Sequence, residues 1–430
     1  MITLLLTNVT YIDKNQKVAK GNILINGGLI KILGDADLCI QDYNTSEIVD
    51  CSKYIVIPGL INGHYHNGSL LAKGLSKEIA INEWEGESLQ GKLQSTLFRH
   101  LDEGLTEEEY FTVCLKGYIN LIKSGVTFVS DSGSSDRTLD YLAKAMSLLG
   151  IRGVIDVEEK VGQYLADKSP DISFTGHLPE EEDINQESLQ QCKKIKEAYD
   201  PRMMTHCLEN TWRKELIYKE YGKSTVELFD EHNLIDAKTV LFHCVELSDA
   251  DIKIIGNRGA SVVHCPVSNI AGGGIANIKD CITSGINVCI GTDWARYDIW
   301  EAMRFAYFLL KINTKRNAHK AEDVFEMATR NGAKAFGLAD KIGIIEDGYY
   351  ADLAFIDKTD FRLLPLLDNP EFSNVVHNLI IECREEMVKH VMVKGKWIMK
   401  DRRITNVDEG RISKDYELIL KKVFGKYNLS

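Results

Sequence analysis

Apolar and polar residues alternate over short stretches at both ends of the chain, a pattern typical of β-strands. The first 57 residues contain "ITLLLTN", "GNILINGGLIKILGD" and "SEIVDCSKYIVIPG", which are rich in β-branched residues and are broken by Gly, Asn and Asp. Near the other end, "ADLAFID", "NLIIEC" and "VKHVMVKGKWIMKDRRI" have the same character. We therefore expect a small β-sandwich domain formed by residues 1–57 together with residues 345–430.

The middle of the chain alternates short apolar runs with longer segments of helical periodicity. Eight runs predict strands, at residues 60–66, 126–133, 153–158, 172–177, 203–209, 239–246, 260–269 and 287–294. Helices fit between most of them, and one has Thr106 as its expected N-cap and Glu109 in the capping-box position. This alternation over roughly 280 residues predicts a (β/α)8 TIM-like barrel at residues 58–344. A doubly wound open sheet is the alternative, but no glycine-rich dinucleotide fingerprint follows its first strand.

Composition narrows the class of partner. The 430-residue chain has a formal net charge of −12, which disfavours binding to a nucleic acid or to an anionic membrane surface. No apolar run approaches the roughly 20 residues that a membrane-spanning helix needs. Ten cysteines without a CxxC pair are too sparse for a disulfide scaffold and indicate a reducing, cytoplasmic compartment. A small-molecule substrate is the partner that remains.

Histidines gather where the predicted strands end. In a barrel of this kind the chemistry lies at the carboxyl ends of the strands. His64 and His66 are two positions apart on the first strand, so both side chains face the same way. His206 and Asp293 end later strands. Three neutral imidazoles and one carboxylate are good ligands for zinc or ferrous iron, so these four residues predict a site for one divalent metal.

Each of these residues also has a structural alternative. His206 could be a core histidine with a backbone partner, Asp293 could cap a turn, and Glu209 could be a solvated carboxylate at a strand end. His264 is predicted within a strand, where a structural or supporting role is favoured. Three cysteines directly follow histidines, at Cys207, Cys244 and Cys265. Because adjacent side chains of a strand point to opposite faces, these thiols are expected to pack behind the strands rather than bind the metal.

Several segments together identify a family resemblance. They are "PGLINGHYHN", "THCLEN", "LFHCVELSDADI", "HCPVSN", "GTDW" and "NGAKAFGLADKIGIIEDGYYADLAFID". The chain resembles the amidohydrolase superfamily over nearly its whole length, and within it the branch of methylthioadenosine/S-adenosylhomocysteine deaminases, guanine and cytosine deaminases and triazine hydrolases. The resemblance implies the metal ligands His64, His66, His206 and Asp293, with zinc as the expected metal and iron as the alternative. "ISFTGH" lacks the lysine that bridges two metals in binuclear members, which favours one metal.

The resemblance also implies catalytic roles. Glu209 matches the glutamate that carries a proton to a ring nitrogen, and His243 matches the histidine that polarises the attacking water or the oxyanion. Asp293 would accept a proton from the attacking water. These roles imply a hydrolytic deaminase of a small amino-substituted N-heterocycle of the purine, pterin, pyrimidine or triazine type, which releases ammonia. Loss of chloride, opening of a cyclic amide, and a metal-free non-enzymatic homologue are the alternatives.

Substrate contacts are expected where this chain departs most from the family, in the loops after the first and fourth barrel strands. His177 in "TGHLPEEEDIN" corresponds to a substrate-contacting histidine of the family. Further candidates for contact with the substrate or for stacking on its ring are Trp84, Asn67, Trp294, Tyr297 and Trp300. Family habit suggests a homodimer.

Overall fold

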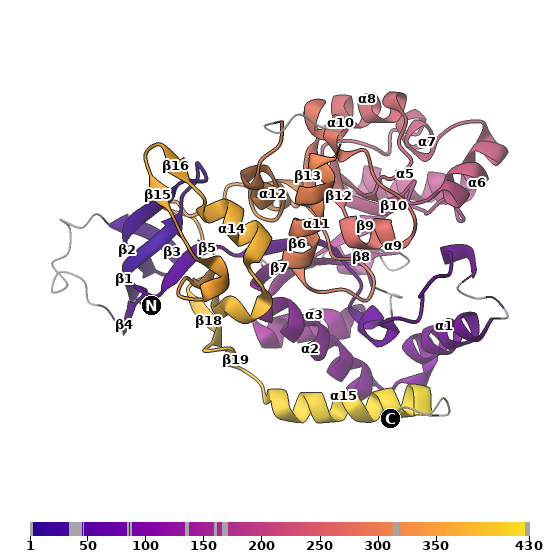
Figure 1. Ribbon diagram of the computed structural model, residues 1–430. Helices are drawn as coiled ribbons and strands as arrows, with labels where there is room; N and C mark the ends of the chain where they lie inside the picture. Colours follow the sequence, from indigo (N-terminus) through magenta and orange to yellow (C-terminus); the bar gives the residue numbers. More distant parts are fainter. Residues whose placement is uncertain are drawn as a thin grey trace. The chain divides into compact units, whose positions relative to one another are not determined.

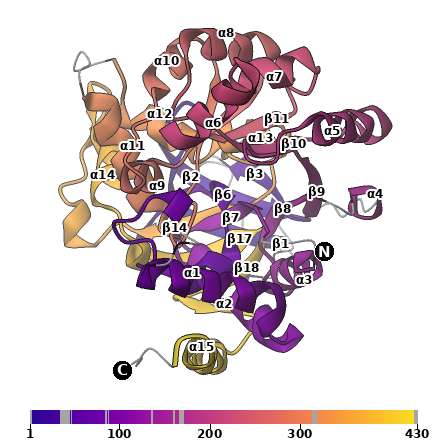
Figure 2. The same ribbon diagram turned by 90° about the vertical axis from the view of Figure 1, so that its right-hand side faces the viewer.

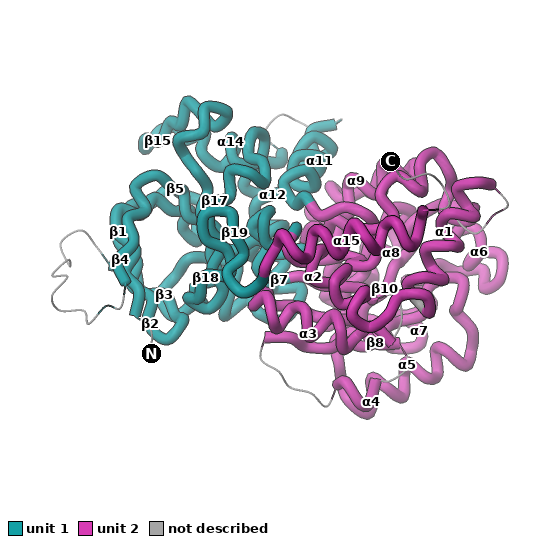
Figure 3. Tube along the Cα trace, turned by 90° about the horizontal axis from the view of Figure 1, so that it is seen from below, with its two compact units in different colours: residues 1–62, 120–128, 298–407 teal, residues 63–119, 129–297, 408–430 magenta. Residues whose placement is uncertain are grey.

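The structure is a computed structural model that describes residues 3–33, 45, 47–83, 86, 88–133, 137–158, 161–165, 171–312 and 318–425. Contacts divide the chain into two compact units (Figure 3). The first unit comprises residues 1–62, 120–128 and 298–407, and the second comprises residues 63–119, 129–297 and 408–430. The predicted boundaries of the barrel domain, at residues 58 and 344, stay a prediction.

One sheet contains eight strands in the order β13-β12-β11-β10-β9-β8-β7-β6. The strands are β6 (Leu60–Tyr65), β7 (Val126–Asp131), β8 (Arg152–Val157), β9 (Ile172–His177), β10 (Met203–Cys207), β11 (Thr239–His243), β12 (Ser261–His264) and β13 (Asn287–Ile290). Most of their residues are buried, as expected for a parallel sheet with helices along the chain between its strands. Figure 2 labels β6, β7, β8, β9, β10 and β11 of this sheet, with α8 and α10 toward the top of the view.

The two outer strands of this sheet approach each other at their carboxyl ends. Tyr65 forms a parallel bridge with Asp293, and the backbone N–H groups of Thr292 and Asp293 donate to the carbonyl oxygen of His64 at 3.1 and 2.9 Å. The sheet is therefore a nearly closed barrel, which confirms the predicted fold class. The closure also places the end of β6 next to the segment that follows β13.

Capping side chains fix the ends of helices that lie wholly or mostly in the second unit. Thr106 and Glu109 form the predicted capping box at the start of α2 (Glu107–Lys123), because each side chain accepts the backbone N–H of the other. Ser248 caps α8 (Asp249–Arg258) in the same way. The other helices are α1 (Leu89–Arg99), α3 (Leu139–Leu149), α4 (Val161–Tyr164), α5 (Gln186–Tyr199), α6 (Thr211–Tyr221), α7 (Thr225–Glu231), α9 (Pro266–Ala271), α10 (Ile278–Thr283) and α15 (Glu409–Phe424). The last, α15, runs alongside α2 (Figure 1), where Lys422 pairs with Glu109 at 2.6 Å.

The first unit contains the second sheet, which joins strands from both ends of the chain. Eight of its nine strands follow the order β19-β18-β17-β14-β5-β1-β2-β3, and β4 also pairs with β1. They are β1 (Thr3–Ile12), β2 (Val18–Asn26), β3 (Leu29–Leu33), β4 (Glu47–Asp50), β5 (Tyr54–Pro58), β14 (Leu353–Asp357), β17 (Val388–Val393), β18 (Lys396–Lys400) and β19 (Arg403–Ile404). The unit also holds α11 (Ile299–Lys311), α12 (Ala321–Met327), α13 (Arg330–Ala335), α14 (Val375–Glu382) and the hairpin of β15 (Asp368–Asn369) and β16 (Phe372–Ser373).

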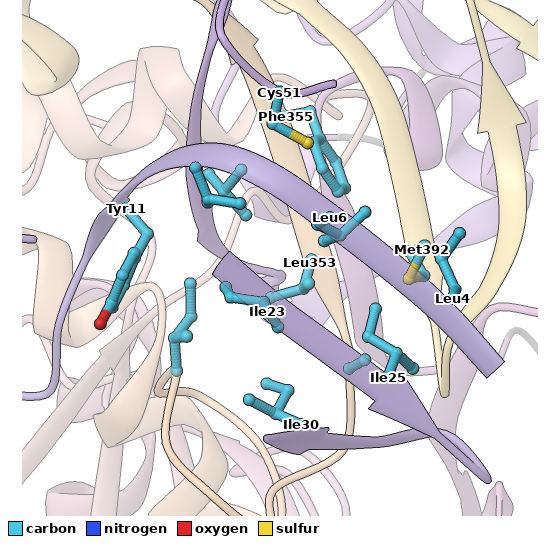
Figure 4. Close-up of a cluster of buried hydrophobic side chains, with 14 residues drawn as sticks. Leu4, Leu6, Tyr11, Ile23, Ile25, Ile30, Cys51, Leu353, Phe355 and Met392 are labelled. Carbon is cyan, nitrogen blue, oxygen red and sulfur yellow. The ribbon is translucent and has the colours of Figure 1, made fainter. Parts of the chain in front are cut away.

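Strand alternation explains the core of this sheet. Leu4 and Leu6 of β1 face one side and join a buried cluster with Ile23 and Phe355 (Figure 4), whereas Leu5 between them belongs to a separate cluster. Each fully buried Leu or Ile side chain contributes roughly 1.5–3 kcal/mol relative to an exposed one. The sheet expected from both termini is thereby confirmed.

Two expectations about elements were wrong. "NLIIEC" was predicted as a strand but lies in and just after α14, because Val375, Val376, Leu379 and Ile380 together place apolar residues on one helical face. Several barrel strands also end earlier than predicted. β12 stops at His264, since Pro266 begins α9 two residues later. Within the described residues, no helix combines the length and apolar character needed to cross a membrane.

Candidate metal centre and active site

Four side chains from three separate parts of the barrel converge in the second unit. His64 and His66 come from β6, His206 from β10, and Asp293 from the segment after β13. Their ligand atoms all lie within 4.8 Å of one another. Among the described residues this is the group of His, Cys, Asp and Glu side chains able to hold a metal ion, and it contains the four residues predicted from the sequence.

The distances fit a single cation. The Nε2 atoms of His66 and His206 lie 3.2 Å apart. Oδ1 of Asp293 lies 3.0 Å from Nε2 of His64 and 3.4 Å from Nε2 of His66. His64 and Asp293 are almost fully buried, so these donors do not simply face solvent. Three imidazoles and one carboxylate around one point match the ligand preference of zinc and of ferrous iron.

The far side of each ring is held by a neighbour. Nδ1 of His66 lies 3.0 Å from the carbonyl oxygen of Ser132, so it donates there and leaves Nε2 toward the centre. Oε1 of Glu180 lies 2.5 Å from Nδ1 of His206. Nδ1 of His64 lies 3.5 Å from the hydroxyl oxygen of Ser132, and its ring stacks on Phe242 with a centroid distance of 3.9 Å. Such partners set the tautomer and orientation of metal-ligating histidines.

Electrostatics favour an ionised Asp293. Burial alone would raise the pKa of this carboxyl, but His243 and hydrogen bonds from His64 and His66 hold its pKa well below the usual range. Burial lowers the pKa of His64 well below its usual value, so this imidazole is neutral. For His206, burial lowers the pKa but Glu180 outweighs burial and raises it to about 9. A cation at Nε2 would displace this proton, because a ligating imidazole is neutral.

Five non-glycine residues at this end of the barrel have backbone conformations in the left-handed region: Leu208, His243, Cys244, Asp293 and Ala295. Leu208, directly after β10, has φ of 47°, His243 at the end of β11 has 66°, and Asp293 has 62°. Such conformations cost of order 1–3 kcal/mol each and persist only where the surrounding structure imposes them. At Leu208 and His243 they coincide with the ends of β10 and β11, which are shorter than predicted.

Glu209 and His243 face the same centre. Nε2 of His243 lies 3.9 Å from Oε1 of Glu209 and 4.0 Å from Oδ2 of Asp293. On the other side of its ring, Nδ1 of His243 lies 2.8 Å from Oδ1 of Asn269. The hydroxyl of Ser268 donates to Oδ2 of Asp293. A carboxylate, an imidazole and the four ligands thus surround one point, an arrangement suited to proton transfer around a hydrolytic metal site.

Sequence reasoning missed four residues of this arrangement. Ser268 and Asn269 lie in α9, and the only signal for them was the "SN" that follows "HCPV". Glu180 and Arg213 were also missed. Their signal was the run of three glutamates after β9 and an arginine four positions after Glu209. Neither sequence pattern by itself predicts which residue each of these four side chains contacts.

His264 and the three paired cysteines are buried behind the site. His264 is the last residue of β12, not a mid-strand residue as predicted, and burial together with His243 lowers its pKa to about 3. This imidazole is therefore neutral, which agrees with a structural role. Cys207, Cys244 and Cys265 are almost fully buried, as expected for thiols that pack as small apolar groups.

The predicted substrate contacts lie in different surroundings. Nδ1 of His177 lies 3.2 Å from Oδ2 of Asp156, and this pairing raises the pKa of His177 although burial lowers it. The ring of Trp294 lies 5.5 Å from that of His66. Asn67 is buried and donates to the carbonyl oxygen of Cys114 at 3.1 Å.

Two further residues, Trp84 and Trp300, were predicted to stack on the substrate ring. Trp84 lies outside the described residues. Trp300 was wrong as a stacking candidate, because it is fully buried and its indole N–H donates to the carbonyl oxygen of Ser124 at 2.8 Å.

Comparisons with known proteins agree with this geometry. Residues 55–398 match the model of the amidohydrolase family, so the chain belongs to this family. It is 30% identical to the 5-methylthioadenosine/S-adenosylhomocysteine deaminase of Pyrococcus furiosus, over 92% of this chain and 94% of that protein.

Solved structures share the fold. An adenosine deaminase from Xanthomonas campestris with bound zinc is similar with a TM-score of 0.88 and 21% identity, over 99% of each chain. An atrazine chlorohydrolase from Arthrobacter aurescens, complexed with zinc and atraton, is similar with a TM-score of 0.85 and 20% identity, over 97% of this chain and all of that one.

Proposed function

We propose that this protein is a metal-dependent hydrolytic deaminase of a small amino-substituted N-heterocycle. The observation that carries the proposal is the convergence of the four ligands with Glu209 and His243, whose facing atoms lie 3.9 Å apart. Membership of the amidohydrolase family and the deaminase activity named for the relative at 30% identity support it. The chain is thus a hydrolase that acts on a carbon–nitrogen bond other than a peptide bond.

We propose zinc as the metal, held by His64, His66, His206 and Asp293. The donor set suits zinc and also ferrous iron, and two proteins of the same fold were crystallised with zinc. A bound divalent cation supplies Lewis acidity, which makes water nucleophilic near neutral pH. The single site agrees with the absence of a lysine from β9, all of whose residues are described.

Asp293, His243 and Glu209 each have a separate role in the proposed reaction. Oδ2 of Asp293 accepts a proton from the attacking water, and Nε2 of His243 stabilises the charge that develops at the attacked carbon. Oε1 of Glu209 delivers a proton to a ring nitrogen, which makes the adjacent ring carbon electrophilic. The water oxygen bonds to that carbon, and the proton held by Asp293 passes to the amino group. The carbon–nitrogen bond then breaks and ammonia leaves, while the remaining hydroxyl proton returns to Glu209 and an oxo group remains.

His177 and Trp294 are the proposed substrate contacts from described residues. His177 ends β9 and has its Nδ1 held by Asp156, which leaves Nε2 for a hydrogen bond to the ligand. Trp294 is partly buried beside His66 and can stack on a planar ring. An adenine-type purine is the first substrate to test, because relatives that cover nearly the whole chain are named as deaminases of adenine nucleosides.

The test is release of ammonia from a panel of aminopurines, aminopterins, aminopyrimidines and aminotriazines by the zinc-loaded protein. We expect turnover of at least one class, and Glu209→Gln should lower it by several orders of magnitude while zinc content stays at one per chain. No ammonia from any class would contradict the proposal. Chloride release from a chlorotriazine, or opening of a cyclic amide, would instead favour the alternative hydrolase. A purified protein that binds no metal would favour the non-enzymatic alternative.

We further propose a cytoplasmic homodimer. Nine described cysteines are free and buried, which suits a reducing compartment. Large apolar side chains are exposed on the first unit at Phe305, Phe308, Ile312, Phe361, Leu364, Leu367 and Phe372. Sedimentation should show a dimer that Phe308→Asp weakens, and a monomer at all concentrations would contradict this proposal.

A further inference from the structure

Arg213 is a buried arginine surrounded by carboxylates. It lies in the first turn of α6, after the N-cap Asn210, and only 5% of it is exposed. Its Nη1 donates to Oε2 of Glu209 at 2.9 Å, and its Nη2 donates to Oε2 of Glu180 at 2.5 Å. Its Nε and Nη2 both donate to Oε1 of Glu182, at 3.1 and 2.7 Å. One guanidinium therefore holds three carboxylates in fixed directions.

Two of these carboxylates reach the metal centre with their second oxygen. Oε1 of Glu180 lies 2.5 Å from Nδ1 of the ligand His206. Oε1 of Glu209 lies 3.9 Å from Nε2 of His243. Arg213 is thus linked to His206 through the side chain of Glu180, and to His243 through the side chain of Glu209. It contacts neither imidazole ring directly.

We propose that Arg213 is a positioning residue that fixes the metal ligand His206, through Glu180, and the proton carrier Glu209 at the same time. The inference rests on the proposed function only for the role of Glu209. The part that concerns His206 depends on metal binding alone.

The geometry gives each oxygen of Glu209 a separate task. Oε2 is anchored by Arg213, so the carboxylate cannot rotate freely, and Oε1 stays directed toward the centre. Glu180 likewise uses its two oxygens for different partners: Oε2 contacts Arg213, and Oε1 contacts His206. A planar guanidinium has its donors in a rigid fork, which a lysine ammonium cannot reproduce. The run of glutamates after β9 therefore supports the metal centre, rather than serving only as part of a substrate loop.

The adjacent residue on the same helix offers a matched control. Lys214 also forms an ion pair, with Oε2 of Glu246 at 3.1 Å, but among the described side chains this pair is formed with neither a proposed metal ligand nor Glu209. Replacement of either cation by methionine removes one positive charge and keeps an unbranched side chain. A general effect of charge loss on α6 would appear in both variants, whereas a positioning effect would appear in Arg213→Met alone.

The experiment compares Arg213→Met, Arg213→Lys and Lys214→Met with the unaltered protein. Zinc affinity is measured by competition with a chelator in the absence of substrate, and kcat and KM are measured at saturating zinc with a substrate found in the ammonia screen. We expect Arg213→Met to weaken zinc binding about 10-fold and to lower kcat about 10- to 100-fold, the range typical of outer-shell partners of metal ligands. KM should change little, because Arg213 does not contact the substrate. Arg213→Lys should fall between, and Lys214→Met should match the unaltered protein.

Several outcomes would overturn the proposal. A folded Arg213→Met protein with zinc affinity and kcat within about twofold of the unaltered values would do so, and so would equal losses in Lys214→Met. If Arg213→Met does not fold, Arg213→Lys decides, since unchanged zinc affinity and kcat in that folded variant would show that the fork is dispensable. Because zinc affinity is measured without substrate, failure to find a deaminase substrate would count against the proposed function and not against the link to His206.

Discussion

The imidazole of His243 and the side-chain amide of Asn269 are joined by a buried hydrogen bond of 2.8 Å between Nδ1 and Oδ1. Because the amide oxygen can only accept, Nδ1 of His243 carries a proton. Nε2 is then the ring nitrogen that faces Glu209 and Asp293. Asn269 therefore determines which ring nitrogen of His243 is available for the chemistry.

Replacement of Asn269 should lower turnover without removing the metal. In Asn269→Leu the imidazole loses its acceptor and can adopt the other tautomer or rotate, so we expect kcat to fall about 10- to 100-fold. Asn269→Asp keeps an acceptor oxygen and should retain more activity than Asn269→Leu. Steady-state kinetics and zinc content of both variants provide the measurement. Equal kcat in Asn269→Leu and the unaltered protein would mean that His243 is oriented in some other way.

Removal of one imidazole should empty the metal site. His64 is fully buried and its Nε2 contacts Asp293 at 3.0 Å, so His64→Ala removes a ligand and leaves a buried carboxylate with fewer partners. We expect zinc content to fall from one per chain to nearly zero. His232→Ala is the control, because this histidine binds the carbonyl oxygen of Leu228 at the end of α7. Elemental analysis that finds full occupancy in His64→Ala would contradict the ligand assignment.

The sequence predicted the convergence of His64, His66, His206 and Asp293 better than the residues that support them, and the reason is geometric. His64 and His66 belong to one strand, where a spacing of two residues fixes a common direction. His206 and Asp293 follow other strands of a fold whose strand ends meet at one rim. By contrast, Asn269 reaches His243 only because Pro266 begins α9 directly after β12. Such contacts depend on the path of a short connection, which no spacing rule describes.

Element type was predictable where several signals agreed. The helix α2 has its N-cap, its capping box and a long apolar face, and it lies where expected. "NLIIEC" offered only a short apolar run, which fits a strand or a buried helix equally. The left-handed conformation of His243 was also unpredictable, because a histidine rarely adopts it without constraint from the surrounding structure.

Asp131 should make the stability of the metal-free protein depend on pH. This carboxyl at the end of β7 is fully buried, and burial raises its pKa from 3.8 to about 7 in the folded protein, although hydrogen bonds from Tyr118 and Asn67 oppose the rise. In the unfolded chain the pKa returns to its ordinary value. Between these two values the folded state binds more protons than the unfolded state, so the free energy of unfolding falls as pH rises, by up to about 1.4 kcal/mol per pH unit.

Asp131→Asn tests this prediction, because asparagine fills the same space without a titrating group. We expect thermal unfolding in the presence of a chelator to show a smaller loss of stability between about pH 5 and about pH 7 for Asp131→Asn than for the unaltered protein. Tyr118→Phe gives the opposite check. It removes the 2.7 Å hydrogen bond that stabilises the ionised carboxylate, which should raise the pKa of Asp131 further and extend the loss of stability to higher pH. Identical pH profiles for the unaltered protein and Asp131→Asn would show that Asp131 is already ionised throughout this range in the folded state, and that the Tyr118 and Asn67 contacts outweigh its burial.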